Sequence, residues 1–209
     1  MSSGLDDSSK GITFFQWMIL GTLTLTSTLY AMSMTIANIA LPQLQGALGA
    51  TQDQIAWTVT FNIIGTAIVT PMTGWLTLRF GQRRLMLCAI FGFATSSILC
   101  GQATALPELV IYRVFQGAFG GPLVPLSQAI ILGVFPRQLH SFATAVWGMG
   151  VVCGPIIGPT VGGYISEAYS WRWIFYIIAP FSLLAFLGAW FYVRNTTHNK
   201  LSKLDWTGF

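Results

Sequence analysis

An all-α membrane protein with six spanning helices is the fold class that the sequence predicts. Apolar residues make up 54% of the chain and charged residues only 8%, a balance typical of membrane proteins rather than of soluble domains. Six apolar segments are each long enough for the roughly 20 residues that a spanning helix needs. They cover approximately residues 14–38, 54–77, 84–104, 107–133, 140–165 and 170–193.

The distribution of basic residues predicts the orientation. Eight Lys and Arg residues fall on one set of alternate connections and tails: Lys10, Arg79, Arg83, Arg84, Arg137, Arg194, Lys200 and Lys203. The opposite set carries only Arg172, together with three acidic residues. Because cytoplasmic loops of membrane proteins are enriched in Lys and Arg, both ends of this segment are expected in the cytoplasm. Residues 1–13 then form a cytoplasmic tail, and residues 194–209 form a cytoplasmic linker.

Polar residues inside three of the predicted helices fall on aligned faces. These residues are Thr24, Ser27, Thr28, Thr35 and Asn38 in helix one, Thr58, Asn62, Thr66 and Thr73 in helix two, and Arg113, Gln116, Gly120, Ser127 and Gln128 in helix four. A single hydroxyl in a membrane helix usually bonds its own backbone. Three faces that each hold an amide or a charge favour a shared polar interior. This interior is either a cavity or a hydrogen-bonded seam.

Arg113 is the one charge that the sequence places well inside a helix. It follows Pro107, the expected start of helix four, by about six residues or ~9 Å, where burial of Arg costs up to ~3 kcal/mol. One interpretation is that its side chain reaches back to the outer interface. The other is that it faces the interior. Since no acidic residue lies in the middle of a helix, its partners would be carbonyls, Gln116, water, or groups outside these 209 residues.

A stripe of glycines marks helix five. Gly150, Gly154, Gly158 and Gly162 are four residues apart, so a helix presents them on one face where another backbone can approach closely. The neighbouring Pro155 and Pro159 each remove a backbone donor, and Gly163 extends the small-residue run. The stripe is either a packing seam or a conformational pivot.

Four motifs resemble those of the major facilitator superfamily, and in particular its fourteen-helix drug:proton antiporters. G-P-x-x-G-P-x-x-G-G at 154–163 resembles the family's fifth-helix motif, and R-V-F-Q-G at 113–117 resembles its fourth-helix motif R-x-x-Q-G. Residues 74–84 resemble the cytoplasmic loop after helix two, with Gly74, Arg79, Gly81 and Arg83 in place. S-M-T-I-A-N-I-A-L-P at 33–42 resembles the family's motif at the end of helix one. The resemblance implies a six-helix amino-terminal half of this fold, built as a three-plus-three inverted repeat. A faint echo of the 74–84 loop at 163–173 agrees with such a repeat.

Two positions depart from the family pattern. Leu78 occupies the place of the acidic residue in the cytoplasmic loop, and Ser33 occupies the place of the usual aspartate in helix one. A serine does not titrate at ordinary pH. Proton coupling would therefore need a carboxylate elsewhere in the protein, or another route.

The resemblance implies a secondary transporter that exports hydrophobic, often cationic or amphiphilic, compounds from the cell across the inner (cytoplasmic) membrane. It implies that Arg113 faces a cavity and takes part in proton or substrate handling. The aligned polar faces extend this predicted substrate and proton pathway to Gln116, Asn38, Asn62, Thr35, Thr66 and Ser127. The resemblance also implies a missing carboxy-terminal half that begins at helix seven, a periplasmic adaptor and an outer-membrane channel. A non-transporting half-fold with an assembly or regulatory role is the alternative.

Other function classes lack support in the sequence. No phosphate-binding loop follows a strand, so ATP is not the expected energy source. The resemblance to drug:proton antiporters implies a proton gradient instead. No H-E-x-x-H or intramembrane carboxylate pair is present, and the two histidines, His140 and His198, lie in predicted loops or tails. No enzyme, metal site, cofactor or nucleic-acid partner is expected.

Overall fold

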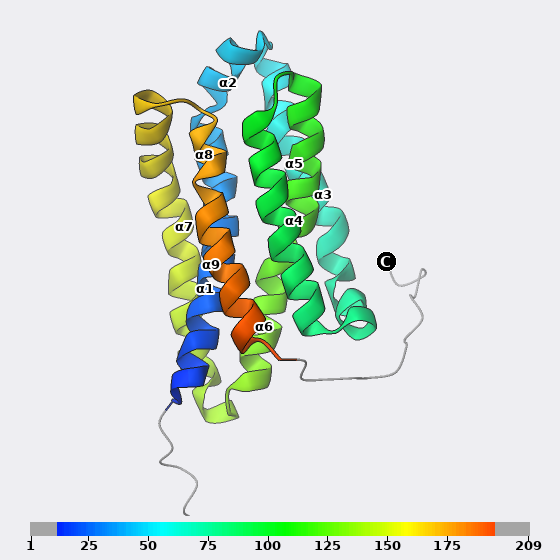
Figure 1. The fold of residues 1–209 in the computed structure, drawn as a ribbon, viewed down its shortest axis with the longest axis vertical. Coiled ribbons are helices and arrows are strands. Elements are labelled where there is room, and N and C mark those ends of the chain that lie inside the picture. Colours follow the sequence, from blue (N-terminus) through cyan, green and yellow to red (C-terminus); the bar gives the residue numbers. More distant parts are fainter. Residues whose placement is uncertain (1–11, 195–209) are drawn as a thin grey trace, which may run out of the picture.

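The computed structural model describes residues 12–194, and every regular element in that range is a helix. In chain order these are α1 (Phe14–Ile39), α2 (Leu41–Leu48), α3 (Gln52–Phe80), α4 (Gln82–Gln102), α5 (Leu106–Gly120), α6 (Leu123–Val134), the 3-10 turn η1 (Arg137–Leu139), α7 (His140–Ala168), α8 (Trp173–Tyr176) and α9 (Ile178–Tyr192). Six segments are long and apolar enough to cross a membrane, with α5–α6 and α8–α9 each making one broken span. The prediction of six spanning helices is confirmed (Figure 1).

Side-chain caps fix the starts of two spans. The Thr13 and Thr51 hydroxyls accept from the backbone N–H of Gln16 and Gln54, whose side chains accept in return from the cap N–H groups. This capping box satisfies donors that a helix start leaves free. It explains why the second span begins at Gln52, ahead of the predicted residue 54.

The connections differ from the sequence prediction in two places. The link between the first two spans contains a short helix, α2, which begins with Pro42 in its first turn. The presumed loop over residues 74–84 is almost entirely helical, so its assignment as a loop was wrong. Gly74 and Arg79 belong to α3, and Gly81 alone separates α3 from α4. Gly81 has φ of 84°, which glycine adopts without the cost that a Cβ imposes.

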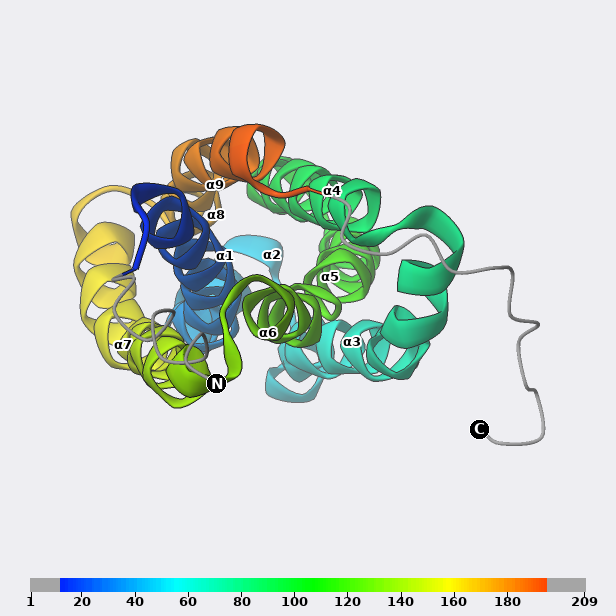
Figure 2. The same cartoon turned by 90° about the horizontal axis from the view of Figure 1, so that it is seen from below.

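The packing of the helix pairs follows the pattern that an inverted repeat predicts (Figure 2). The first span packs most closely on the fifth, α1 on α7, and the fourth packs on the second, α5 on α3. If spans one, two and three correspond to spans four, five and six, each of these two pairs is the counterpart of the other. The third and sixth spans, α4 and α9, also pack together.

Two arginines repeat the same contact at opposite ends of that third pair. Arg83, in the first turn of α4, donates to the Trp190 carbonyl in the last turn of α9 (2.7 Å) and lies over the Trp190 ring. Arg172, just before α8, donates to the Ala103 carbonyl at the end of α4 (3.2 Å) and lies over the Trp171 ring. Each arginine at the start of one span therefore binds free carbonyls at the end of the other. This pairing supports the repeat that the faint sequence echo suggested.

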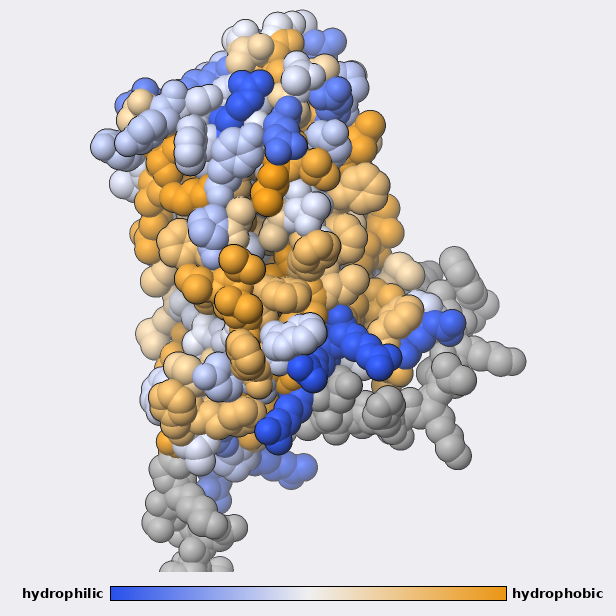
Figure 3. All heavy atoms as spheres, in the orientation of Figure 1, coloured by the Kyte–Doolittle hydropathy of each residue, from blue (hydrophilic) through white to orange (hydrophobic). Residues whose placement is uncertain are grey.

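The surface has the character expected in a bilayer. Apolar side chains cover the middle of the face seen in Figure 3, and hydrophilic residues gather toward its ends. The exposed large side chains include many from α3, α7 and α9. Residues 1–11 and 195–209, most of the predicted tail and linker, lie outside the described residues.

Candidate functional site: a buried arginine cluster

Arg113 lies fully inside the bundle. Its side chain is only 1% exposed, so it does not reach out to the membrane interface, and that interpretation of the sequence is wrong. Its Nε donates to the Thr58 carbonyl in α3 (3.2 Å), and its Nη1 donates to the Gln116 side chain one turn away (2.6 Å). Gln116 in turn donates to the Ser97 hydroxyl in α4 (2.7 Å). The guanidinium also lies over the Phe175 ring of α8, 5.7 Å from its centre.

The backbones of α3 and α5 lie close together beside Arg113, and side chains of α3 donate hydrogen bonds to backbone carbonyls of α5. The Asn62 amide donates to the Arg113 carbonyl (2.9 Å), and the Thr66 hydroxyl to the Gly117 carbonyl (3.2 Å). A Cβ on Gly65 or Gly117 would collide with backbone atoms of the facing helix. Close approach of this kind lets polar side chains reach across helices.

Tyr30 extends the cluster to the first span. Its hydroxyl lies 3.0 Å from the Thr66 hydroxyl, and its ring packs edge-on against Phe93 of α4. The first, second, third and fourth spans are thereby joined through polar contacts and ring packing around one buried cation.

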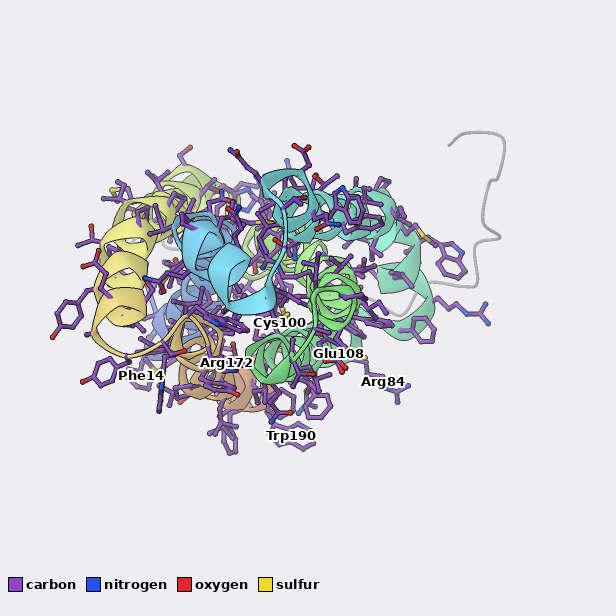
Figure 4. The ribbon with its side chains drawn as sticks, turned by 90° about the horizontal axis from the view of Figure 1, so that it is seen from above. Phe14, Arg84, Cys100, Glu108, Arg172 and Trp190 are labelled. Carbon is purple, nitrogen blue, oxygen red and sulfur yellow. The ribbon has the colours of Figure 1, made fainter. Side chains whose placement is uncertain are left out.

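The charge of Arg113 has no acidic partner in the part of the chain that the structure describes. The ionisable side chains that lie near it are Cys100 and Tyr30. Figure 4 shows Cys100 toward the middle of the bundle. The Nη2 of Arg113 and the Oδ1 of Asn62 are both buried without a hydrogen-bond partner among the described residues. A buried cation with a spare donor is costly unless another group meets it. The cluster therefore retains capacity to bind an anionic group or water.

The structure brings together four of the seven predicted pathway residues: Arg113, Gln116, Asn62 and Thr66. The other three lie apart from these hydrogen bonds. Thr35 is half-buried and donates to its own helix at the Met32 carbonyl. Asn38 is exposed at the end of α1. Ser127 is buried in α6, and its hydroxyl has no partner among the described residues.

Sequence reasoning left out Ser97, Tyr30 and Phe175 as members of the cluster. Ser97 could have been found, because Thr95, Ser96 and Ser97 form a polar run in the middle of an otherwise apolar stretch. No sequence signal singles out Tyr30 or Phe175 among the many aromatic residues. The members Arg113, Gln116, Ser97, Thr58 and Asn62 are each at most 2% exposed. In this conformation the shared polar interior is a hydrogen-bonded seam.

The glycine stripe of α7 forms a second seam, against α1. A Cβ on Gly154 would lie 2.7 Å from the Thr28 carbonyl oxygen, and one on Gly158 would lie 2.6 Å from the Thr35 hydroxyl. A Cβ on Gly150 would likewise collide with Thr24, and one on Gly162 with Ile36. A Cβ on Gly163 would make only an ordinary contact, 3.8 Å from Ile39. Four of the five residues on the polar face of helix one thus contact α7: Thr24, Ser27, Thr28 and Thr35. The fifth, Asn38, is exposed.

Hydrogen bonds accompany this seam, and α7 stays helical throughout. Thr28 donates to the Gly150 carbonyl (2.8 Å), and the Trp147 indole donates to Ser27 (3.1 Å). Pro155 and Pro159 lie within the continuous helix His140–Ala168. The close packing that the stripe predicts is present; its role as a pivot stays a prediction.

Comparison with known proteins identifies the family. The family model of the Major Facilitator Superfamily matches residues 23–207 of the sequence. The chain belongs to this superfamily. It is 44% identical over 168 residues to the multidrug export protein EmrB of Haemophilus influenzae, a match that covers 80% of this chain and 33% of that protein. It is 38% identical over 184 residues to the fatty acid resistance protein FarB of Neisseria gonorrhoeae, covering 88% of this chain and 36% of that one.

Solved structures agree on the fold. A D-xylose-proton symporter superposes with a TM-score of 0.75 at 18% identity, over 86% of this chain and 48% of that chain. A bacterial homologue of the lysosomal transporter Spinster gives 0.75 at 17% identity, over 94% and 47%. The chain spans about a third of the length of the curated relatives described above, and corresponds to their amino-terminal portion. The predicted half of a major facilitator fold is confirmed.

Proposed function

We propose that this chain supplies one half of a proton-coupled secondary transporter that exports hydrophobic and amphiphilic compounds. The observation that carries the proposal is 44% identity over 168 residues to a multidrug export protein. The wall of the transport pathway contributed by this half then includes the Arg113 cluster, and the other wall comes from the rest of the protein, because transporters of this architecture bind substrate between two halves.

We further propose that the proton-coupling step involves Arg113. Ser33 occupies the place where the family has an aspartate in helix one. Within the six described spans, carboxylates are found only at the helix ends. A carboxylate from the other half would meet the spare donor of Arg113 in one access state. Protonation or displacement by substrate would release it, since a neighbouring cation favours the charged form of a carboxyl. The proton gradient, and not ATP, is the proposed energy source.

The location follows the charge bias. We place the protein in the cytoplasmic membrane with both ends of this segment in the cytoplasm, because eight of nine basic residues outside the helix interiors lie on that side. The resemblance to fourteen-helix antiporters extends the proposal to a periplasmic adaptor and an outer-membrane channel. Co-purification with the full-length protein tests those partners.

Substitution of Arg113 in the full-length protein tests the coupling. Arg113→Lys keeps the charge but loses the planar guanidinium, which donates to Thr58 and Gln116 at the same time. Export driven by a pH gradient is therefore expected to persist in part. Arg113→Gln removes the charge and is expected to abolish such export at equal expression. Thermal unfolding of both variants separates loss of folding from loss of coupling. Wild-type export by Arg113→Gln at every pH tested would show that Arg113 is only structural.

A further inference from the structure

We propose that a hollow between α3, α4 and α5 binds one anionic phospholipid of the cytoplasmic leaflet. The hollow has a volume of about 390 Å³ and lies beside the short α3–α4 connection. Its walls come from Val69 and Leu76 of α3, Leu85 and Cys88 of α4, and Phe119 of α5. An acyl chain occupies this space, and the lipid phosphate binds Arg84 at its edge.

The composition of the walls suits an acyl chain. Arg84 is the one charged residue among those that line the hollow, and nearly all the others are apolar. None of the residues of the Arg113 cluster takes part, so the hollow is separate from the proposed transport pathway. Phe80, which lines the hollow, is 49% exposed, and Leu78, two residues before it, is 45% exposed. Apolar surface of this kind at membrane depth is covered by lipid tails or by protein.

The charge around the hollow selects the lipid class. Arg84 is exposed, and it has no hydrogen bond or ion pair with any residue that the structure describes. Figure 4 shows it at the outer edge of the bundle. Arg79, at the same end, lies over the rings of Trp75 and Phe80.

No described acid offsets these cations. The acidic residues in the described range are Asp53, Glu108 and Glu167, and all three lie at the end of the bundle opposite to Arg84. Leu78 occupies the position where the family motif has an acidic residue. A basic cluster at the cytoplasmic end of a span attracts anionic lipid. A phospholipid supplies both the phosphate for Arg84 and the chain for the hollow, so it fits better than a small anion or an uncharged solute.

Binding of defined lipids to the purified full-length protein tests the proposal. Native mass spectrometry gives the dissociation constants for dioleoyl phosphatidylglycerol and dioleoyl phosphatidylcholine. Arg84→Gln is expected to weaken phosphatidylglycerol binding about fivefold and to leave phosphatidylcholine unchanged. Arg137→Gln is the matched control, because Arg137 is also exposed at the same end but does not line the hollow. Equal losses in both variants would overturn the site in favour of a diffuse basic rim.

Two natural cysteines report where the lipid lies. Cys88 lines the hollow, whereas Cys153 is exposed on α7. Phosphatidylglycerol is expected to slow maleimide labelling of Cys88 while labelling of Cys153 proceeds at the same rate. Unchanged labelling of Cys88, or protection by an export substrate but not by the lipid, would overturn the proposal. Neither lipid binding nor cysteine labelling requires transport. A negative result in these experiments therefore does not contradict the proposed export function, and absence of export does not contradict the lipid site.

Discussion

Gly154→Ala tests whether the first and fifth spans touch through their backbones. A Cβ at Gly154 would lie 2.7 Å from the Thr28 carbonyl oxygen and 3.0 Å from the Met32 nitrogen. Both atoms belong to the backbone of α1, so they move only if the whole helix moves. Gly148 lies on the same helix, and a Cβ there would have nothing within 4 Å. It is the matched control.

The two substitutions share one energy term and differ in another. Replacing Gly by Ala in a helix interior gains about 1 kcal/mol of helix propensity. Gly148→Ala is expected to show that gain alone. At Gly154 the extra methyl overpacks the seam, which costs about 1–3 kcal/mol. The net effect then lies between no change and a loss of about 2 kcal/mol. The variants should differ in stability by the overpacking term.

Thermal unfolding of the full-length protein in one detergent measures this difference. Gly154→Ala is expected to unfold at a lower temperature than Gly148→Ala, and Gly154→Leu at a lower temperature still. If the stripe is also a pivot, Gly154→Leu abolishes export in protein that still inserts into the membrane. Equal unfolding temperatures for the two alanine variants would refute the backbone contact and, with it, the argument from the glycine stripe.

Two further predictions concern orientation and the inverted repeat. Cysteines introduced at the exposed residues Gln52 and Gln138 are expected to react with an impermeant maleimide from opposite sides of intact cells, Gln52 from outside; labelling of both from one side would contradict the six-span topology. Arg83→Gln and Arg172→Gln each remove the charge-assisted hydrogen bond to a helix end described above. Such a bond contributes about 1.5–3 kcal/mol where buried and less at half-buried positions such as these. The two variants should lower the unfolding temperature by similar amounts, and a silent Arg172→Gln would argue against equivalent roles.

The sequence by itself determined the class, the spans and the family. Six apolar runs, the spacing of Gly150 to Gly162 and the motif around Arg113 are local features, and a membrane constrains them strongly because every backbone donor in lipid must be satisfied within a helix. Helix ends were less well determined. Gly74 and Arg79 were assigned to a loop because the family motif is Gly-rich and basic, yet a single residue, Gly81, suffices to reverse the chain.

Only the tertiary structure decided which polar residues meet. Thr35 and Asn62 look alike in sequence, each one turn from other polar groups on a spanning helix. The rotation of α1 places Thr35 against Gly158 of α7, whereas the rotation of α3 places Asn62 against the Arg113 carbonyl. In lipid, helix rotation is set by packing against the other helices and not by a simple difference between apolar and polar faces. That packing depends on contacts between residues far apart in the chain, and a periodic pattern within one helix does not contain it.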